Sequence, residues 1–451
     1  MLKKNEIYEV DIIDNGYQGE GIAKIDNMPI FIQGAIAGER LEIKILKVQS
    51  SFAYGKIIKI IKPSTERVET ECKDYNRCGG CNLRHVKYEE TLKIKKATVQ
   101  NCIYKSFGQE LEVKDVIGMK TPMFYRNKLQ YPVGVDKENM PVMGIYASRS
   151  HNIIPVHKCY IQNETCEEIA RDIFEFVKNN DISTYNEETL KGTVRHIVVK
   201  IGVKTNEILV TLVLNDKNFK YDEKFIKFIT LKHPNIKTIV KNYNMKNTNV
   251  ILGKENEVIY GDGYIYDILG EYKFKISPLS FYQVNPVQTE ILYNTAMKHV
   301  QKEEGKIALD LYCGIGTIGI FASRYFEKVY GIEIVEEAIA NAKENAKINN
   351  IGNIEFYAGD VEKVLPKILE KENIKPNTIF VDPPRKGLDN NTIQLLNSLE
   401  AENIIYISCN PATLARDLKL LSEKYEIGEV QPVDMFPYTS HVECVTVLQL
   451  I

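Results

Sequence analysis

The sequence predicts an α/β protein built from three parts: an N-terminal β-barrel, a central α+β domain, and a C-terminal domain with a doubly wound, mainly parallel sheet. Three observations support this fold class. Short strands alternate with turns over residues 1–62, a tight group of cysteines opens the middle of the chain, and strands alternate with helices from residue 305 onward. The length of 451 residues suits about three domains.

The first domain, residues 1–62, is predicted to be a small barrel of OB type. Its strands alternate apolar and polar residues, and a glycine-rich turn over 15–21 follows the first of them. Pro63 and Ser64 mark the linker that ends the domain. The predicted strands are 8–13, 29–32, 39–45 and 53–61.

The second domain, residues 66–275, combines a predicted helix over 88–107 with strands such as 196–201 and 207–213. Residues 84–128 hold ten Lys and Arg against five Asp and Glu, whereas the whole chain has 58 basic and 60 acidic side chains and a net charge of −2. Aromatic residues are interleaved with these charges near Tyr125. The stretch therefore predicts a local basic surface that binds RNA phosphates and stacks bases.

The third domain, residues 276–451, shows short apolar strands separated by helical stretches, the pattern of a parallel sheet with helices on both faces. In such a sheet, ligands bind at the carboxyl ends of the strands. The predicted strands are 306–311, 328–332, 354–357, 378–381, 403–407, 425–433 and 444–451, with helices over 318–326 and 336–349.

A glycine-rich loop follows the first strand of this domain. It contains G-x-G-x-x-G at Gly314, Gly316 and Gly319, and Glu333 ends the next strand, where a carboxylate can hold a ribose diol. Enzymes that bind NAD share this pattern. Asp310, just before the loop, suits a cationic amino-acid ligand better than a pyrophosphate. The loop therefore predicts S-adenosylmethionine as the cofactor, with NAD as the alternative.

Three further motifs lie where strands of the same sheet end or begin. Asp382 opens an Asp-Pro-Pro-Arg loop, Cys409 stands between a strand and a helix N-terminus, and Glu443 precedes the last strand. The helix N-terminus is expected to lower the pKa of the Cys409 thiol. A thiolate that adds to C6 of a pyrimidine makes C5 nucleophilic, and a base must later remove the C5 proton. Cys409, Glu443 and a sulfonium cofactor match these requirements.

The cysteine group has the spacing of a metal site. Cys72, Cys78 and Cys81 lie close together around a Gly-Gly turn, and Cys159 is a plausible fourth ligand. Four thiolates suit either an iron–sulfur cluster or zinc, and at zinc His157 is able to replace one cysteine. Spacing alone leaves this choice open.

These motifs together resemble the RNA uracil-5-methyltransferases, most of all the bacterial 23S rRNA 5-methyluridine enzymes that carry an iron–sulfur cluster. The resemblance covers nearly the whole chain and is most specific at residues 382–385, 408–411 and 441–443. It implies that the C-terminal domain is a Rossmann-type methyltransferase domain, that the barrel is a TRAM domain, and that the central domain holds a [4Fe–4S] cluster.

The resemblance also implies a role for individual residues, and for Gln283 it is the sole source of that role. Cys409 is the implied nucleophile and Glu443 the base that removes the C5 proton. The implied S-adenosylmethionine-binding residues are Gln283, Tyr312, Glu333 and Asp382, and the implied cluster ligands are Cys72, Cys78, Cys81 and Cys159.

The expected function is S-adenosylmethionine-dependent methylation of C5 of a uridine in 23S rRNA, with RNA as the partner and no membrane or obligate protein partner. The first residues show no apolar signal segment, and no run approaches the ~18 apolar residues of a membrane span. A cytoplasmic location is therefore expected. The alternatives are a tRNA uridine methyltransferase, a non-catalytic RNA-binding or RNA-folding protein, and an iron–sulfur redox enzyme with a nicotinamide cofactor.

Overall fold

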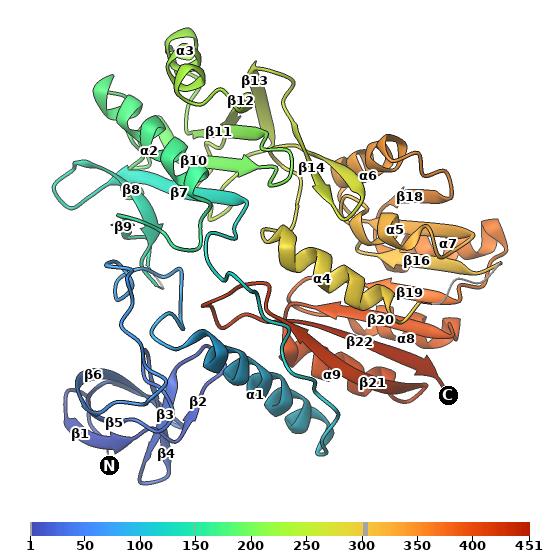
Figure 1. Ribbon diagram of the computed structural model, residues 1–451, viewed down its shortest axis with the longest axis horizontal. Helices are drawn as coiled ribbons and strands as arrows, with labels where there is room; N and C mark the ends of the chain where they lie inside the picture. The colour runs from blue at the N-terminus through green and yellow to red at the C-terminus, as the bar shows by residue number, and fades with distance from the viewer. Residues whose placement is uncertain (1, 149, 301–304) are drawn as a thin grey trace.

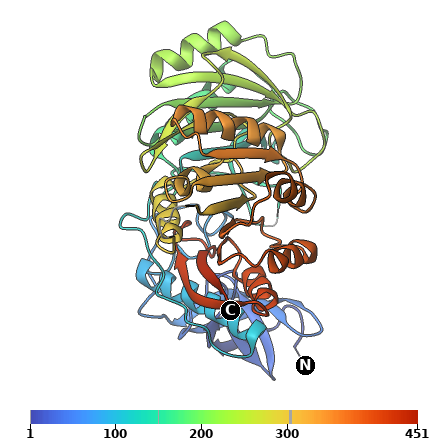
Figure 2. The same cartoon turned by 90° about the vertical axis from the view of Figure 1, so that its right-hand side faces the viewer.

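The computed structural model describes residues 2–148, 150–300 and 305–451. In Figure 1 the barrel lies at the lower left, the central sheet at the upper left and the C-terminal domain on the right. Figure 2, turned by 90°, shows the C-terminal sheet between the central sheet above and the barrel below. No helix within the described ranges combines the length and the apolar composition that crossing a membrane requires.

The N-terminal barrel is a six-stranded sheet in the order β1-β5-β6-β4-β3-β2. Apolar side chains such as Ile30 and Leu41 fill it. The predicted glycine-rich turn ends earlier than expected, because Gly21 already begins β3, where a Cβ atom would stand 2.6 Å from that of Ala35. The strands are β1 Ile7–Asp11, β2 Asp14–Asn15, β3 Gly21–Ile25, β4 Met28–Ile32, β5 Arg40–Val48 and β6 Ala53–Lys62.

The central domain is built on a mixed seven-stranded sheet in the order β13-β12-β11-β10-β7-β8-β9. Helices α2 (Glu164–Asn179) and α3 (Asp222–Lys232) pack with this sheet around one apolar core. The strands are β7 Lys128–Val135, β8 Pro141–Tyr146, β9 Ile153–Pro155, β10 Val194–Ile201, β11 Ile208–Leu214, β12 Ile236–Tyr243 and β13 Glu255–Tyr260. A hairpin of β14 (Ile265–Leu269) and β15 (Tyr272–Ile276) leads to the C-terminal domain.

Helix α1 spans Tyr88–Phe107, as predicted, but it packs against the C-terminal domain rather than on the central sheet. Its residues Val99 and Ile103 belong to the apolar core on one face of the C-terminal sheet. The strand-like contacts of Val113 and Ile117 with β21 continue this association. The segment that follows the cysteine group in sequence is therefore part of the C-terminal domain in space.

The C-terminal sheet confirms the predicted doubly wound pattern, in the order β18-β17-β16-β19-β20-β22-β21. The first five strands are parallel, and β22 runs antiparallel to both neighbours. Its elements are α4 Pro286–Met297, β16 Ile307–Leu311, α5 Thr317–Ala322, β17 Lys328–Glu333, α6 Glu336–Ile348, β18 Ile354–Ala358, α7 Val361–Glu372, β19 Thr378–Val381, α8 Asn390–Leu399, β20 Asn403–Ser408, α9 Pro411–Leu421, β21 Tyr425–Val433 and β22 Glu443–Leu450.

Helix α5 is shorter than the predicted 318–326 helix. It ends at Ala322 because the chain must reverse and enter β17 at Lys328. Phe326 packs edge-on against Phe380 of β19 instead of extending the helix face.

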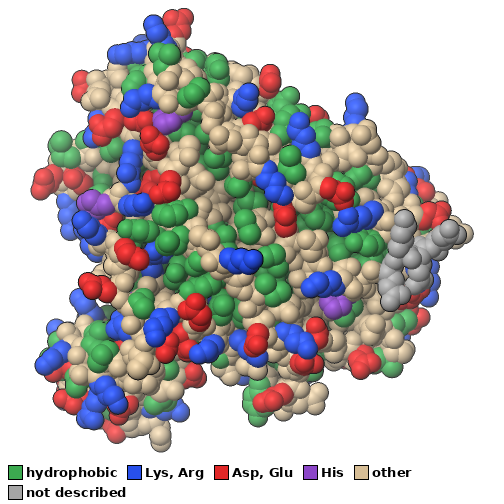
Figure 3. Space-filling view, in the orientation of Figure 1, with side chains coloured by type: hydrophobic (Ala, Val, Ile, Leu, Met, Phe, Trp, Pro, Cys, Tyr) green, Lys and Arg blue, Asp and Glu red, His purple; other side chains and the backbone are tan. Residues whose placement is uncertain are grey.

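Two of the basic side chains in the predicted basic surface over residues 84–128 do not lie on the surface. Arg84 and Lys95 are only 4% and 1% exposed, so neither side chain faces a phosphate from this position. Counting charges along the chain does not reveal which of them point inward. On the face shown in Figure 3, basic and acidic side chains are interspersed.

Candidate active site

The sequence motifs meet at one edge of the C-terminal sheet. Strands β17, β16, β19 and β20 are neighbours and parallel, so their carboxyl ends lie side by side. Strand β22 is antiparallel, so its first residue lies at that same edge. The edge therefore presents Glu333, the glycine loop, Asp382, Cys409 and Glu443 in spatial order.

The glycine loop is shaped by its hydrogen bonds to two carboxylates. Asp310 is fully buried, and its Oδ2 accepts from the backbone N–H of Gly319 at 2.7 Å, while its Oδ1 has no partner. Glu333 Oε2 accepts from the N–H of Gly314 at 3.2 Å. A Cβ atom at Gly314 would meet open space, and its φ is +55°. The loop is thus tied to two carboxylates at the sheet edge, and open space remains beside Gly314.

The other three predicted cofactor residues lie within the loop, at the end of β19 and before α4. Tyr312 is half-buried and adopts a φ of +66°, a strained conformation for a residue with a side chain. Asp382 is half-buried at the end of β19, and burial raises its pKa to about 7. Gln283 lies in the segment just before α4, where its carbonyl accepts from Asn127 Nδ2 at 3.0 Å.

Cys409 and Glu443 lie across two neighbouring strands, despite the 34 positions between them. Ser408 of β20 pairs with Cys444 of β22 and the strands are antiparallel, so Cys409, which follows Ser408, comes opposite Glu443, which precedes Cys444. Cys409 is half-buried and Glu443 is almost fully buried. Their side chains therefore share one side of the sheet edge, as a nucleophile and a base acting on one ring must.

The electrostatics of this pair differ from the expectation. Burial raises the pKa of the Cys409 thiol to about 11, and the carboxyl groups of Glu443 and Asp382 add to the rise, while Arg385 opposes it. Burial likewise raises the pKa of Glu443 to about 8, with Asp382 adding and Arg385 opposing. The expected lowering of the Cys409 pKa at the helix N-terminus is wrong, first because the thiol is partly buried and then because the carboxyls of Glu443 and Asp382 lie near it.

Two residues that the sequence analysis gave no role complete the surroundings. Arg385 is the cation that acts on both Cys409 and Glu443, and its place in the Asp-Pro-Pro-Arg motif was the available signal. Tyr17, in the barrel loop between β2 and β3, donates from its hydroxyl to Asn410 Oδ1 at 2.8 Å. Asn410 follows the thiol and caps α9, so the barrel touches the nucleophile loop. No sequence pattern predicted that contact.

The four cysteines of the predicted cluster line one cavity. Cys72, Cys78, Cys81 and Cys159 surround it together with Arg84. Burial raises the pKa of the thiols, to about 12 for Cys81 and about 11 for Cys159. Among the described residues, no three or more His, Cys, Asp or Glu side chains form a group that holds a metal ion as it stands. The structure alone therefore does not show an iron–sulfur domain.

His157 does not belong to this cavity. Its side chain is 74% exposed, and its Nδ1 lies 3.1 Å from Asp74 Oδ1. The structure therefore gives no support to His157 as a zinc ligand.

The fold and the site define an S-adenosylmethionine-dependent methyltransferase. Comparison with known families is more specific: the profile described as tRNA (uracil-5-)-methyltransferase matches residues 87–451, and the TRAM domain profile matches residues 2–58. The chain belongs to this family of RNA uracil-5-methyltransferases and carries a TRAM domain at its N-terminus.

Two bacterial relatives match nearly the whole chain. An uncharacterized RNA methyltransferase of Clostridium acetobutylicum is 46% identical over 453 residues, covering 99% of this chain and 98% of the relative. An uncharacterized RNA methyltransferase of Clostridium tetani is 44% identical over 448 residues, covering 99% and 97%.

A solved structure is also similar over the whole length. The Pyrococcus abyssi tRNA (uracil-54, C5)-methyltransferase, in complex with S-adenosyl-L-homocysteine, superposes with a TM-score of 0.78 at 27% identity, covering 98% of this chain and 100% of that one. The comparisons confirm the predicted family, the TRAM barrel, S-adenosylmethionine and RNA as the substrate class. The 23S rRNA substrate and the iron–sulfur cluster stay predictions.

Proposed function

We propose that the enzyme methylates C5 of a uridine through a covalent bond between Cys409 and C6. The observation that carries this proposal is the pairing of β20 with β22, which sets Cys409 beside Glu443 at the sheet edge. Asp382 is the next carboxylate along that edge, and Asp310 and Glu333 shape the loop beyond it. This order separates the Cys409–Glu443 pair, which would act on the uracil ring, from the carboxylates at the glycine loop, which would hold the cofactor.

The proposed reaction proceeds through a covalent adduct. The thiol of Cys409 gives its proton to solvent water, and the thiolate forms a bond to C6, which moves the π electron pair of the C5–C6 double bond onto C5 and O4. Bound S-adenosylmethionine would supply the methyl carbon: the C5 electron pair forms the bond to it while the sulfur–methyl bond breaks, and S-adenosyl-L-homocysteine is the leaving group. Glu443 then takes the proton from C5, the C5–C6 double bond returns, and the C6–sulfur bond breaks to release the thiolate.

The residues around the glycine loop fit the proposed cofactor role. Glu333 is tied to the loop by a backbone N–H, which leaves its carboxylate oriented for a ribose diol. The Oδ1 of Asp310 has no partner, and burial raises the pKa of Asp310 to about 8 and that of Asp382 to about 7, so a bound sulfonium would favour the ionised form of either carboxyl. Gln283 and Tyr312 are proposed to complete this site.

We further propose that Cys72, Cys78, Cys81 and Cys159 hold a [4Fe–4S] cluster. Their shared cavity and the mutual influence of their thiols on one another's pKa support this set. Arg84, which also lines the cavity, has two buried guanidinium nitrogens without a partner and would face the negative charge of thiolate ligands. The cluster would stabilise this loop rather than take part in methyl transfer.

The proposed RNA is 23S rRNA, on the resemblance to the cluster-containing rRNA enzymes. A tRNA uridine is the second candidate, because the Pyrococcus abyssi protein is a tRNA methyltransferase. That protein aligns over 98% of this chain, so the barrel region does not separate the two candidates. Mapping 5-methyluridine in 23S rRNA and tRNA from a strain that lacks the gene decides between them.

The covalent mechanism is tested with paired variants. Cys409→Ala should lose methylation and form no covalent RNA complex. Glu443→Gln should still transfer the methyl group but accumulate protein bound to methylated RNA, which survives denaturation. Normal turnover by Glu443→Gln, without such a complex, would refute the base assignment.

A further inference from the structure

Residues 434–442, which join β21 to β22, are unusually buried for a strand connection. Such loops normally lie on the surface, yet Asp434, Met435, Pro437 and Thr439 are all buried. Glu443, the proposed base, begins β22 directly after this segment. Whatever fixes the segment therefore also fixes the start of β22.

Five consecutive backbone carbonyls of this segment each accept a hydrogen bond from another part of the chain. Buried carbonyls require partners, and these come from donors remote in sequence. The bonds are Gln288 Nε2 to Asp434 O at 3.0 Å, Asn285 Nδ2 to Met435 O at 3.0 Å, Lys95 Nζ to Phe436 O at 3.0 Å, Tyr125 Oη to Pro437 O at 3.1 Å, and the N–H groups of Asn82 and Leu83 to Tyr438 O at 3.1 and 3.0 Å.

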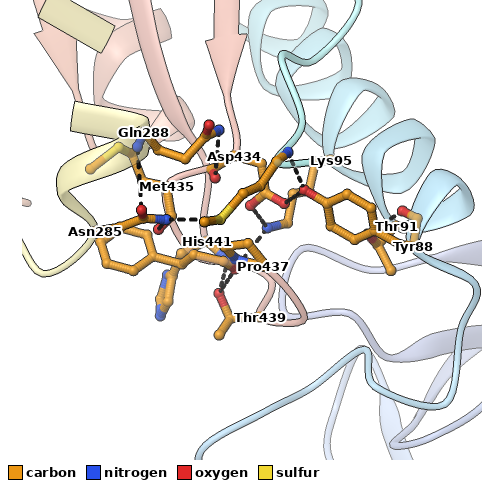
Figure 4. A network of polar contacts seen from close by, with 12 residues as sticks. Tyr88, Thr91, Lys95, Asn285, Gln288, Asp434, Met435, Pro437, Thr439 and His441 are labelled. Carbon is orange, nitrogen blue, oxygen red and sulfur yellow. Dashed lines mark hydrogen bonds and ion pairs between the residues drawn. The ribbon is translucent and has the colours of Figure 1, made fainter. Parts of the chain in front are cut away.

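A buried ion pair holds the first residue of the segment. Lys95 Nζ lies 2.5 Å from Asp434 Oδ1, with side chains only 1% and 0% exposed, and Tyr88 donates to Asp434 Oδ2 at 2.8 Å. Figure 4 shows the segment between Lys95 and Tyr88 of α1 on one side and Asn285 and Gln288 of α4 on the other. Lys95 thus bonds both the side chain of Asp434 and the backbone two residues later.

The same segment contacts the cysteine loop. Asn82 and Leu83, which bond Tyr438, directly follow Cys81. The guanidinium of Arg84 lies 4.7 Å from the centre of the Tyr438 ring. The donors therefore come from α1, α4, Tyr125 and the cysteine loop, which meet at this one strand connection.

We propose that Lys95 and Asp434 are positioning residues, which hold the segment 434–438 so that Glu443 reaches the C5 proton. The inference rests on the proposed role of Glu443. Lys95 is buried and its ammonium bonds Asp434 and the carbonyl of Phe436, so its loss acts through the segment. A base displaced from C5 slows proton removal, while attack by Cys409 from β20 and cofactor binding at the glycine loop continue.

The test uses full-length protein with Lys95→Met, the double variant Lys95→Met with Asp434→Asn, and Tyr88→Phe. The double variant removes both buried charges together and therefore keeps the test open if the single variant does not fold. Lys424→Met is the matched control, because Lys424 lies outside residues 84–128 and pairs at 2.9 Å with Glu400, and both side chains are 49% exposed. Circular dichroism establishes which variants are folded.

Each protein is assayed with in vitro transcripts of 23S rRNA and tRNA, made with uridine or with 5-fluorouridine. In the double variant we expect kcat on uridine RNA to fall roughly ten- to a hundredfold, the scale of misplacing a reacting group by about 1 Å. The affinity for RNA measured without turnover, S-adenosyl-L-homocysteine affinity and adduct formation with 5-fluorouridine RNA should be unchanged. Methylated adduct on uridine RNA should accumulate, and Lys424→Met should behave as wild type.

Two results would overturn the positioning role. If folded variants release product at the wild-type rate, the segment does not position Glu443. An equal loss of cofactor binding, adduct formation and release shows that the ion pair supports the fold in general. Absence of adduct in the wild-type protein is a different failure, because it refutes the proposed Cys409 mechanism itself.

Discussion

Release of the methylated RNA should depend on pH in a way that the surroundings of Glu443 determine. Burial and the Asp382 carboxyl raise the pKa of Glu443 to about 8, and Arg385 limits the rise. A base must be ionised to accept the C5 proton. In the covalent adduct the Cys409 sulfur is already bonded to C6, so its own pKa does not contribute to this step.

The expected magnitude follows from the fraction of Glu443 that is ionised. With a pKa of about 8, about one carboxyl in eleven is ionised at pH 7 and about ten in eleven at pH 9, so decay of the adduct should speed up roughly tenfold between these values. Asp382→Asn removes a neighbouring negative charge and should move the midpoint to lower pH. Arg385→Gln removes the opposing cation and should move it to higher pH.

The assay forms the adduct on RNA labelled with tritium at C5 of uridine, shifts the pH, and follows tritium release to water at saturating S-adenosylmethionine. Arg385→Lys should restore the wild-type midpoint, and Lys386→Gln, a change at the exposed neighbouring position, serves as the matched control. A release rate that does not change between pH 6 and 9, or midpoints that stay fixed in both charge variants, would refute the assignment of Glu443 as the base.

Three further predictions address the cluster, the barrel and the cofactor loop. Protein purified without oxygen should be brown and contain iron and acid-labile sulfide in similar amounts, which Cys78→Ala should lose; one zinc and no sulfide by metal analysis would contradict this. Removing residues 1–62 should weaken salt-dependent RNA binding, and calorimetry should show that S-adenosylmethionine binding is intact. The variant Tyr17→Phe loses the hydrogen bond to Asn410 and should lower kcat without changing RNA affinity. Burial raises the pKa of Asp310 to about 8, so the folded state keeps a proton that the unfolded chain releases near pH 4. The free energy of unfolding should therefore fall by up to about 4 kcal/mol as the pH rises from 5 to 8. Thermal unfolding of Asp310→Asn should show a smaller fall over the same pH range.

The sequence predicted the C-terminal architecture and the meeting of Cys409 with Glu443 for one physical reason. In a sheet of this kind, functional side chains gather where neighbouring strands end, and both residues were recognisable as strand-end positions. The barrel was predictable because its strands alternate regularly. Strand β3 was missed because a glycine, needed for close packing against Ala35, opens it. The boundaries at 62 and 275 stay predictions.

Features set by contacts between distant segments were not predictable. The pKa of Cys409 was misjudged because the helix end is visible in sequence, whereas the burial of the thiol and the nearby carboxyls of Glu443 and Asp382 depend on the packing of other strands. Lys95 was counted in a basic surface, although it pairs with a residue 339 positions away. A lysine on a helix is ordinarily solvated, and only the packing of α1 against the C-terminal domain reveals that this one is buried.

The contact between Tyr17 of the barrel and Asn410, which follows Cys409, restricts which TRAM domains can replace this one. Gly19 packs closely on Leu83, which follows the cysteine group: a Cβ atom at position 19 would stand 2.9 Å from Leu83 Cδ2. In the same barrel loop, the Tyr17 hydroxyl donates a hydrogen bond to Asn410. A barrel grafted from a relative must therefore bring a loop that fits both surfaces. An otherwise well-folded chimera with a mismatched loop would disturb the residue next to Cys409, so the two domains are expected to be inherited as a matched pair.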